Sequence, residues 1–181
     1  MNVWFDAAAG RSHALFTANS GAVPKTDQNV LVPMGSAEGD PSIHMVAKIA
    51  NYDVETGVDT AVSASASFES NSYAPQFGEM LTSHQDTHAS TTSGGTVDSG
   101  ASSADGGSAV LQVFSIASGT ADIKIQHSSN GSAWSDLLTF TAVTASTSEY
   151  VAATGTVNRY LRCRSTNTFT DLVFAVDFAR S

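Results

Sequence analysis

The sequence has a single cysteine, Cys163, and few positively charged residues. One cysteine excludes an internal disulfide framework. Lysine and arginine together number 8 and aspartate and glutamate 17, which gives a formal net charge of −9. This balance disfavours tight binding to nucleic acid, because such binding needs cations that displace condensed counterions. It also disfavours anchoring to an anionic membrane surface.

Long apolar runs are absent as well. No stretch approaches the ~20 residues that a membrane-spanning helix requires. The first residues, Met1-Asn-Val-Trp-Phe-Asp6, lack the basic and apolar segments of a signal peptide. We therefore expect a soluble protein made in a reducing cytoplasm, with no membrane partner.

The sequence does contain a series of short strand patterns between residues 108 and 164. Each piece is rich in Val, Ile, Thr, Tyr or Phe and is bounded by Gly, Asn or Ser, as in antiparallel all-β modules. Asn130-Gly131 separates two pieces and predicts a tight type I′ hairpin turn. Alternation with polar neighbours predicts one face toward a core and one toward water. The expected sandwich core comprises Val110, Val113, Ile123, Ile125, Trp134, Leu161 and Phe174.

The clearest strands of the first half run from Ile43 to Asp53 and from Val58 to Glu69. Their short connection predicts a hairpin. One face of the second strand is small and polar, and an open strand edge of this kind invites pairing with a neighbouring chain. Before the hairpin, Ser12 is expected to cap a short helix that ends at Ala18. The residues expected to carry assembly are Ile43, Met45, Ile49, Val62, Ser63, Ser65, Ser67 and Phe68.

The stretch from Gln85 to Gly95 is a Ser/Thr/Gly/Asp segment with little to bury, which is typical of a linker. It places a domain boundary near residue 93. The sequence therefore predicts an all-β protein of two modules, residues 1–93 with one short helix and residues 94–181 as a small antiparallel β-sandwich.

Two places in the sequence suggest a metal site or a reactive thiol, and both are better explained as structural residues. His84 and His88 are spaced like metal ligands, with Asp86 between them, but the segment lacks helix formers, so a solvated loop is favoured over a metal site or a pH-responsive one. Cys163 lies between two arginines, yet strand alternation turns it inward as a small core residue. We expect no metal, no cofactor, no catalytic residue and no enzyme activity.

An aromatic set offers a binding hypothesis. Trp134, Tyr150 and Tyr160 could form a platform for sugars, because such rings stack on flat apolar faces. The favoured alternative is that Trp134 fills the sandwich core.

Two runs in the C-terminal module form a family pattern: Ser118-Gly-Thr-Ala-Asp-Ile-Lys-Ile-Gln-His-Ser-Ser-Asn-Gly-Ser-Ala-Trp-Ser-Asp-Leu137 and Thr154-Gly-Thr-Val-Asn-Arg-Tyr-Leu-Arg162. On these residues the sequence resembles tail tube (major tail) proteins of long-tailed bacteriophages, which carry a C-terminal Ig-like β-sandwich. Upstream, Trp4-Phe-Asp, Ala37-Glu-Gly-Asp and Val62-Ser-Ala-Ser-Ala-Ser-Phe-Glu-Ser are similar to the second half of the tube domain, less specifically.

The resemblance implies a virion structural protein, made in the host bacterial cytoplasm. Residues 1–93 would be a tube-type β-sheet or barrel domain that forms stacked, hexameric rings, contacting passing DNA only non-specifically. Residues 94–181 would decorate the outside. Strands that precede Trp4 in that family have no counterpart here, which leaves three alternatives. A second chain would complete the tube sheet, or the true start would lie upstream of Met1. In the third alternative, the protein would be a head decoration or other virion surface protein. A carbohydrate-binding sandwich, with host surface glycans as partners, is the alternative from another class.

Overall fold

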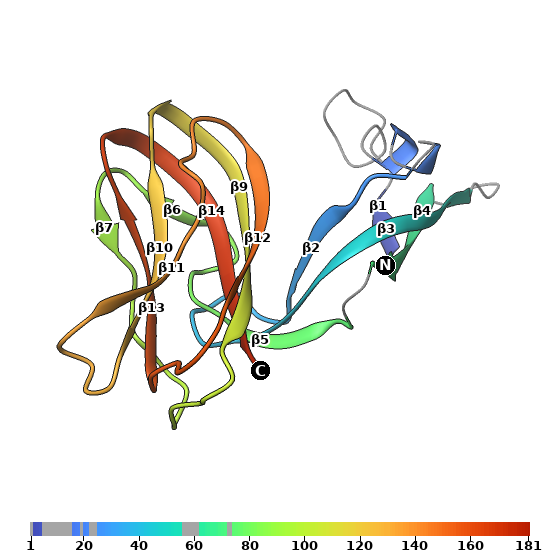
Figure 1. The fold of residues 1–181 in the computed structure, drawn as a ribbon. Helices are drawn as coiled ribbons and strands as arrows, with labels where there is room; N and C mark the ends of the chain where they lie inside the picture. Colours follow the sequence, from blue (N-terminus) through green and yellow to red (C-terminus); the bar gives the residue numbers. More distant parts are fainter. Residues whose placement is uncertain (1, 5–15, 19, 22–24, 56–61, 72–73) are drawn as a thin grey trace. The chain divides into compact units, whose positions relative to one another are not determined.

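The computed structural model describes residues 2–4, 16–18, 20–21, 25–55, 62–71 and 74–181 (Figure 1). The fold is all-β, with antiparallel strand pairs, and among the described residues only 16–18 and 20 are helical. The strands in the described part of the chain are β1 (Asn2–Trp4), β2 (Gln28–Pro33), β3 (Pro41–Glu55), β4 (Ser63–Ser70), β5 (Gln76–Met80), β6 (Asp86–His88), β7 (Thr92–Ser93), β8 (Val97–Asp98), β9 (Gly107–Gly119), β10 (Asp122–Ser128), β11 (Ser135–Thr139), β12 (Thr147–Ala153), β13 (Tyr160–Thr166) and β14 (Phe169–Arg180). No helix among these residues is long and apolar enough to cross a membrane.

The chain divides into two compact units. The smaller unit comprises residues 1–28 and 46–74, and the larger comprises residues 29–45 and 75–181. Strand β3 contributes its first residues to the larger unit and the rest to the smaller one. This division differs from the boundary expected near residue 93, because β5, β6 and β7 pair with β13 and β14 of the sandwich.

The smaller unit is built on the β3–β4 hairpin, with β1 on the outer side of β4. The predicted hairpin is confirmed, although Val58 at its expected start lies outside the described residues. Ala64 and Ala66 are buried, whereas Ser63 and Ser67 are exposed, as the alternation predicted. The Phe16 ring packs on Tyr52 with 5.5 Å between the ring centroids. The expected helix cap, Ser12, also lies outside the described residues.

A β-bulge interrupts the β3–β4 pairing between Ile49 and Asn51. A bulge removes backbone groups from the strand ladder. Lys25 replaces the lost partners, since its ammonium donates hydrogen bonds to the carbonyls of Ile49 at 2.5 Å and Ala50 at 2.9 Å.

The larger unit is a sandwich of two antiparallel sheets (Figure 1). One has the order β5-β14-β9-β12, with β6 also paired to β14 and the first residues of β3 paired to β5. The other has the order β11-β10-β13, and both β7 and β8 pair with β13. The core between them confirms five of the expected residues, Val113, Ile123, Ile125, Leu161 and Phe174.

The other two expected core residues lie elsewhere. Val110 is fully buried but alternates with the core residues Ala109 and Leu111, so it lies on the opposite face of β9. Trp134 is only half-buried and stands outside the core cluster, so its placement in the core was wrong. The cause is a register shift between Ile125 and Gln126, where the β11 partner changes from Leu138 to Asp136. One extra β11 residue reverses which side chains face inward.

Two local predictions are corrected by the backbone. The β10–β11 connection covers residues 129–134 rather than a two-residue turn, and the Asn130 side-chain oxygen accepts from the backbone N–H groups of Ser132 and Ala133 at 2.9 Å. Gly131 does have the positive φ expected of a turn, 70°. The prediction of a linker from Gln85 to Gly95 was wrong, because the short strands of this segment pair with the sandwich and His88 is buried.

Candidate functional site

The β3–β4 hairpin offers an incomplete edge. Strand β1 pairs with β4 only at Ser63, Ala64 and Ser65. No other strand of the described chain pairs along the outer edge of β4 from Ser67 to Ser70. The side chain of Ser67 is exposed there, whereas Ser65 lies between Asn2 and Asp53 of its own chain.

The structure separates the eight residues expected to carry assembly. Ile43 and Met45 belong to the larger unit, where Ile43 pairs with Phe77 of β5. Ile49 is buried, and Phe68 is half-buried with its ring 6.1 Å from that of Phe16. Val62 and Ser65 are half-buried, and Ser63 and Ser67 are exposed. A neighbouring chain could therefore reach the exposed serines and the outer edge of β4, whereas Ile49 is out of reach and the other apolar residues are only partly accessible.

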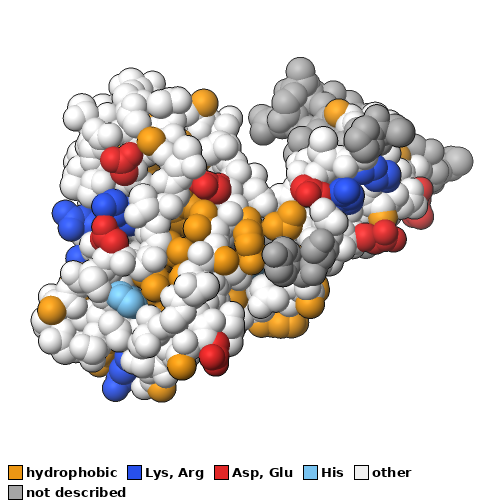
Figure 2. All heavy atoms as spheres, viewed as in Figure 1, with side chains coloured by type: hydrophobic (Ala, Val, Ile, Leu, Met, Phe, Trp, Pro, Cys, Tyr) orange, Lys and Arg blue, Asp and Glu red, His pale blue; other side chains and the backbone are white. Residues whose placement is uncertain are grey.

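The larger unit has its own exposed apolar side chains. Phe77 on β5 is 72% exposed, and Val32, Met34 and Phe114 are also exposed. Figure 2 shows hydrophobic side chains at the surface of the larger unit. Phe77 borders a hollow of about 280 Å³ that Phe178 and Arg180 also line. An exposed phenylalanine beside a hollow is suited to contact with another protein surface.

Sequence analysis missed a buried polar cluster in the larger unit, formed by Ser42, His44, Ser108 and Asp177. His44 Nδ1 lies 2.8 Å from Asp177 Oδ2, and His44 Nε2 lies 2.8 Å from Ser108 Oγ. The Ser42 hydroxyl donates to Asp177 Oδ2 at 2.8 Å, and the Val110 N–H donates to Asp177 Oδ1 at 3.1 Å. Both carboxylate oxygens of Asp177 are therefore occupied.

The order Ser108–His44–Asp177 is that of a nucleophile, base and orienting carboxylate. A nucleophile must touch its substrate, however, and Ser108 is 6% exposed while His44 and Asp177 are fully buried. None of these residues lines the hollow beside Phe77 or the one formed by residues 141–149. The arrangement instead fastens the start of β3 to β9 and β14, since such buried networks fix strand position when every member is paired.

Residues 29–45 cover the sheet face that carries this cluster. Gln112 donates to the Asn29 carbonyl at 2.7 Å, and Asn29 donates to the Ser148 hydroxyl at 3.2 Å. The His44 ring meets Tyr150 edge-on at 5.9 Å. Val110 is buried because residues 29–45 cover its face of β9. Tyr150 packs against His44 on this covered face and not at a sugar platform.

The expected aromatic platform is not assembled as a set. Tyr150 belongs to the β14-β9-β12 sheet, whereas Trp134 and Tyr160 lie at the other sheet. Trp134 carries the Arg162 guanidinium over its ring at 4.2 Å, and the Arg159 guanidinium lies 4.9 Å from the Tyr160 ring centroid. Cation–π stacking of this kind holds both rings against charged neighbours.

The second half of the His84–His88 segment forms β6 (Asp86–His88), whereas His84 lies in an exposed turn, so the expected solvated loop is present only at the start of the segment. His88 is 3% exposed, accepts or donates a 2.6 Å hydrogen bond with Ser165 Oγ, and lies 3.4 Å from Asp86. Burial lowers the pKa of His88, although Asp86 and Glu38 oppose that shift. His84 is exposed and apart. Among the described residues, no group of His, Cys, Asp or Glu could hold a metal ion.

Cys163 is a core residue, as strand alternation predicted, and is fully buried. Burial raises the pKa of the thiol, with smaller contributions from Asp86 and Glu38. The thiolate form is therefore disfavoured.

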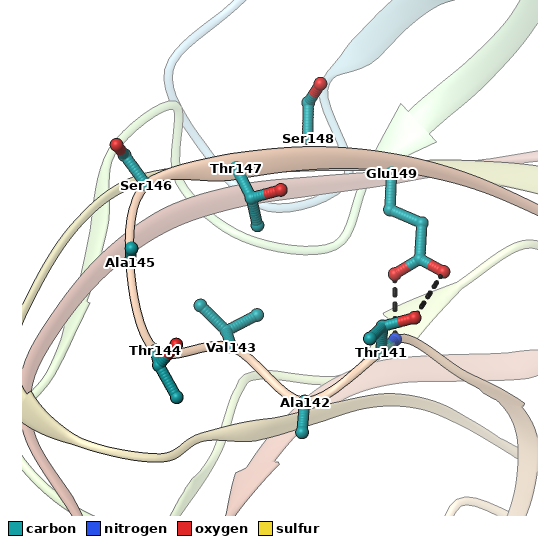
Figure 3. Close-up of a pocket in the computed structure, with 9 residues that line it drawn as sticks. All are labelled: Thr141, Ala142, Val143, Thr144, Ala145, Ser146, Thr147, Ser148 and Glu149. Carbon is teal, nitrogen blue, oxygen red and sulfur yellow. Dashed lines mark hydrogen bonds between the residues drawn. The ribbon is translucent and has the colours of Figure 1, made fainter.

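Another hollow is formed by a single loop, residues 141–149, and has a volume of about 540 Å³ (Figure 3). The Glu149 carboxylate accepts the Thr141 N–H at 2.7 Å and the Thr141 hydroxyl at 3.0 Å. Small side chains make up the rest of the lining, among them Ala142, Val143 and Ala145. The one charged group is thus engaged in closing the loop.

No protein family, curated protein or solved structure matches the chain.

Proposed function

We propose that the protein is a structural component of a bacteriophage virion, a tail tube protein that assembles as homo-oligomeric rings. The observation that supports this best is the outer edge of β4, which β1 covers only from Ser63 to Ser65. Unpaired strand edges readily accept a strand from another chain. A neighbouring subunit that pairs along Ser67 to Ser70 would extend the small sheet from one subunit to the next, as a ring requires.

The exposed Phe77 adds a second contact to this proposal. A phenylalanine at 72% exposure is costly in an isolated protein, and aromatic side chains are enriched where proteins meet. A head decoration or other virion surface protein would use the same two features on a different partner. The proposed function is therefore assembly and involves no catalysis.

Ser67→Lys tests this proposal. Ser67 is exposed on the hairpin, so the substitution places a charge at the proposed interface without disturbing the core. Mass measurement in solution and electron microscopy should show rings for the parent protein and monomers for the variant. Ser115→Lys, at an exposed serine of β9, is the matched control and should assemble like the parent. Rings formed equally by the Ser67→Lys protein would refute the hairpin as the assembly surface.

A second candidate function, carbohydrate binding by the sandwich, is favoured by the position of Trp134. The ring lies at the sheet surface and is half-buried, rather than in the core. Surface aromatic rings with polar neighbours are the usual means by which sandwiches hold sugars.

A further inference from the structure

The outer face of the β11-β10-β13 sheet gathers positive charge in a strongly acidic chain. Of the 8 lysines and arginines, Lys124, Arg162 and Arg164 stand on this face. Lys124 is directly opposite Arg164 in the strand register, and Gln126 is opposite Arg162. Like charges that face each other across antiparallel strands are destabilising. The face therefore carries an electrostatic cost that a bound anion would relieve.

The remaining polar side chains of the face hold one another in place. Lys124 donates to Asp136 at 2.7 Å, and Gln126 donates to the other Asp136 oxygen at 2.8 Å. Arg162 donates through Nε and Nη2 to the Gln126 oxygen, at 2.9 and 2.7 Å, while stacking on Trp134. A row of side chains fixed in this way is pre-organised for a ligand.

Arg164 is the exception in this row. No hydrogen bond or ion pair within the described chain reaches its guanidinium, and its Nε is shielded from solvent without a partner. The charge of Arg164 still acts on its neighbours. Burial is the main cause of the lowered pKa of Arg162, and the charge of Arg164 lowers it further. The hydrogen bonds from Lys124 and Gln126 are the main causes of the lowered pKa of Asp136, and Arg164 adds a smaller contribution. Asp122, at the start of β10, is engaged by the Asn167 amide at 3.3 Å. Arg164 is thus the free cation of the face.

We infer that this face binds an acidic polysaccharide through the carboxylates of uronic-acid sugars. A guanidinium matches a planar carboxylate, so Arg164 would hold the sugar carboxylate. Asp136 would accept from hydroxyl groups, and Trp134 would meet the flat side of the pyranose ring. Gln126 is buried and would act by positioning Asp136 and Arg162. A pyranose offers hydroxyl groups to Asp136 and a flat side to Trp134, whereas a glycerol phosphate backbone has no ring to stack, so we expect the uronic-acid polymer to bind better although Asp136 repels both anions. The inference rests on the carbohydrate-binding candidate and is independent of ring assembly.

The test is binding of the full chain to polygalacturonate at low salt, measured by calorimetry. The same polymer with its carboxylates methyl-esterified is the neutral comparison. Poly(glycerol phosphate) and oligothymidylate represent phosphate polymers and nucleic acid. We expect binding to polygalacturonate and much weaker binding to the other three.

Arg164→Gln should weaken polygalacturonate binding roughly fivefold or more, because it removes one charge-assisted hydrogen-bond donor. Its thermal midpoint should equal or exceed that of the parent, because repulsion of Lys124 is relieved. Lys48→Gln removes one cation from the smaller unit and should bind like the parent. Equal binding by Arg164→Gln, or equal binding of a phosphate polymer, would overturn the inference. Equal binding of the esterified polymer would overturn it while leaving carbohydrate binding intact, and binding to neither polysaccharide would remove both.

Discussion

Asp177→Ala is the most informative single change for the stability of the sandwich. It removes the acceptor of three buried donors, the Ser42 hydroxyl, the His44 ring and the Val110 N–H. Each buried donor left without a partner costs about 1–3 kcal/mol, and the costs of three donors at one site are not fully additive. We expect a loss of ~3–5 kcal/mol in the free energy of unfolding.

Urea denaturation followed by circular dichroism measures this loss. For a slope of about 2 kcal/mol per molar urea, the midpoint should fall by roughly 2 M. Asp105→Ala, which truncates an exposed carboxylate in the loop before β9, should leave the curve unchanged.

Asp177→Asn separates hydrogen bonding from charge. The amide oxygen can still accept from Val110, and the amide N–H₂ can donate to His44 Nδ1 if the imidazole proton moves to Nε2. Ser108 Oγ then accepts from Nε2, and Ser42 accepts from the amide. Because every buried group keeps a partner, we expect a loss of only about 1–2 kcal/mol, for the weaker neutral hydrogen bonds. The reasoning is refuted if Asp177→Ala costs under ~1 kcal/mol, or if the asparagine variant is as unstable as the alanine variant.

Three further predictions concern single features. Cys163 should not react with a thiol reagent until the protein is unfolded in urea, because it is buried in the core; stoichiometric labelling of native protein would contradict this. Burial lowers the pKa of His88, so on acidification the unfolded chain binds a proton at this residue before the folded protein does. The free energy of unfolding should therefore fall as the pH drops from about 6.5 toward the lower folded pKa. His88→Gln should reduce this pH dependence of the melting temperature. Gly131→Val should lower the melting temperature, since Gly131 has a φ of 70° that valine adopts with strain, whereas the neighbouring Ser132→Val should change it less.

The strands of the sandwich could be predicted because each has one face in the core. Ile123 and Ile125 of β10 and Leu161 and Cys163 of β13 alternate with polar residues, and all four are fully buried. This pattern needs only the sequence of one strand at a time.

Features that depend on pairing between distant strands could not be predicted. Trp134 was expected in the core, but the extra β11 residue at the Ile125/Gln126 register shift turns Asp136 to the outer face with Gln126. The sequence of a single strand does not indicate such a bulge. Likewise His44 and Asp177 are polar residues in apolar strand patterns, and their face of the sheet is buried because residues 29–45 cover it.

The buried cluster also bears on the proposed assembly. His44 lies two residues before Val46, where β3 passes from the larger unit into the smaller one and continues as the first strand of the hairpin. The cluster therefore anchors the base of β3, which pairs with β4, the strand whose outer edge would meet a neighbouring subunit. Asp177→Ala should weaken both folding and ring formation, whereas Ser67→Lys should abolish rings at unchanged stability. If Asp177→Ala protein that remains folded, as judged by circular dichroism at low temperature, still forms rings as fully as the parent by electron microscopy, then anchoring of β3 by Asp177 is not required for assembly.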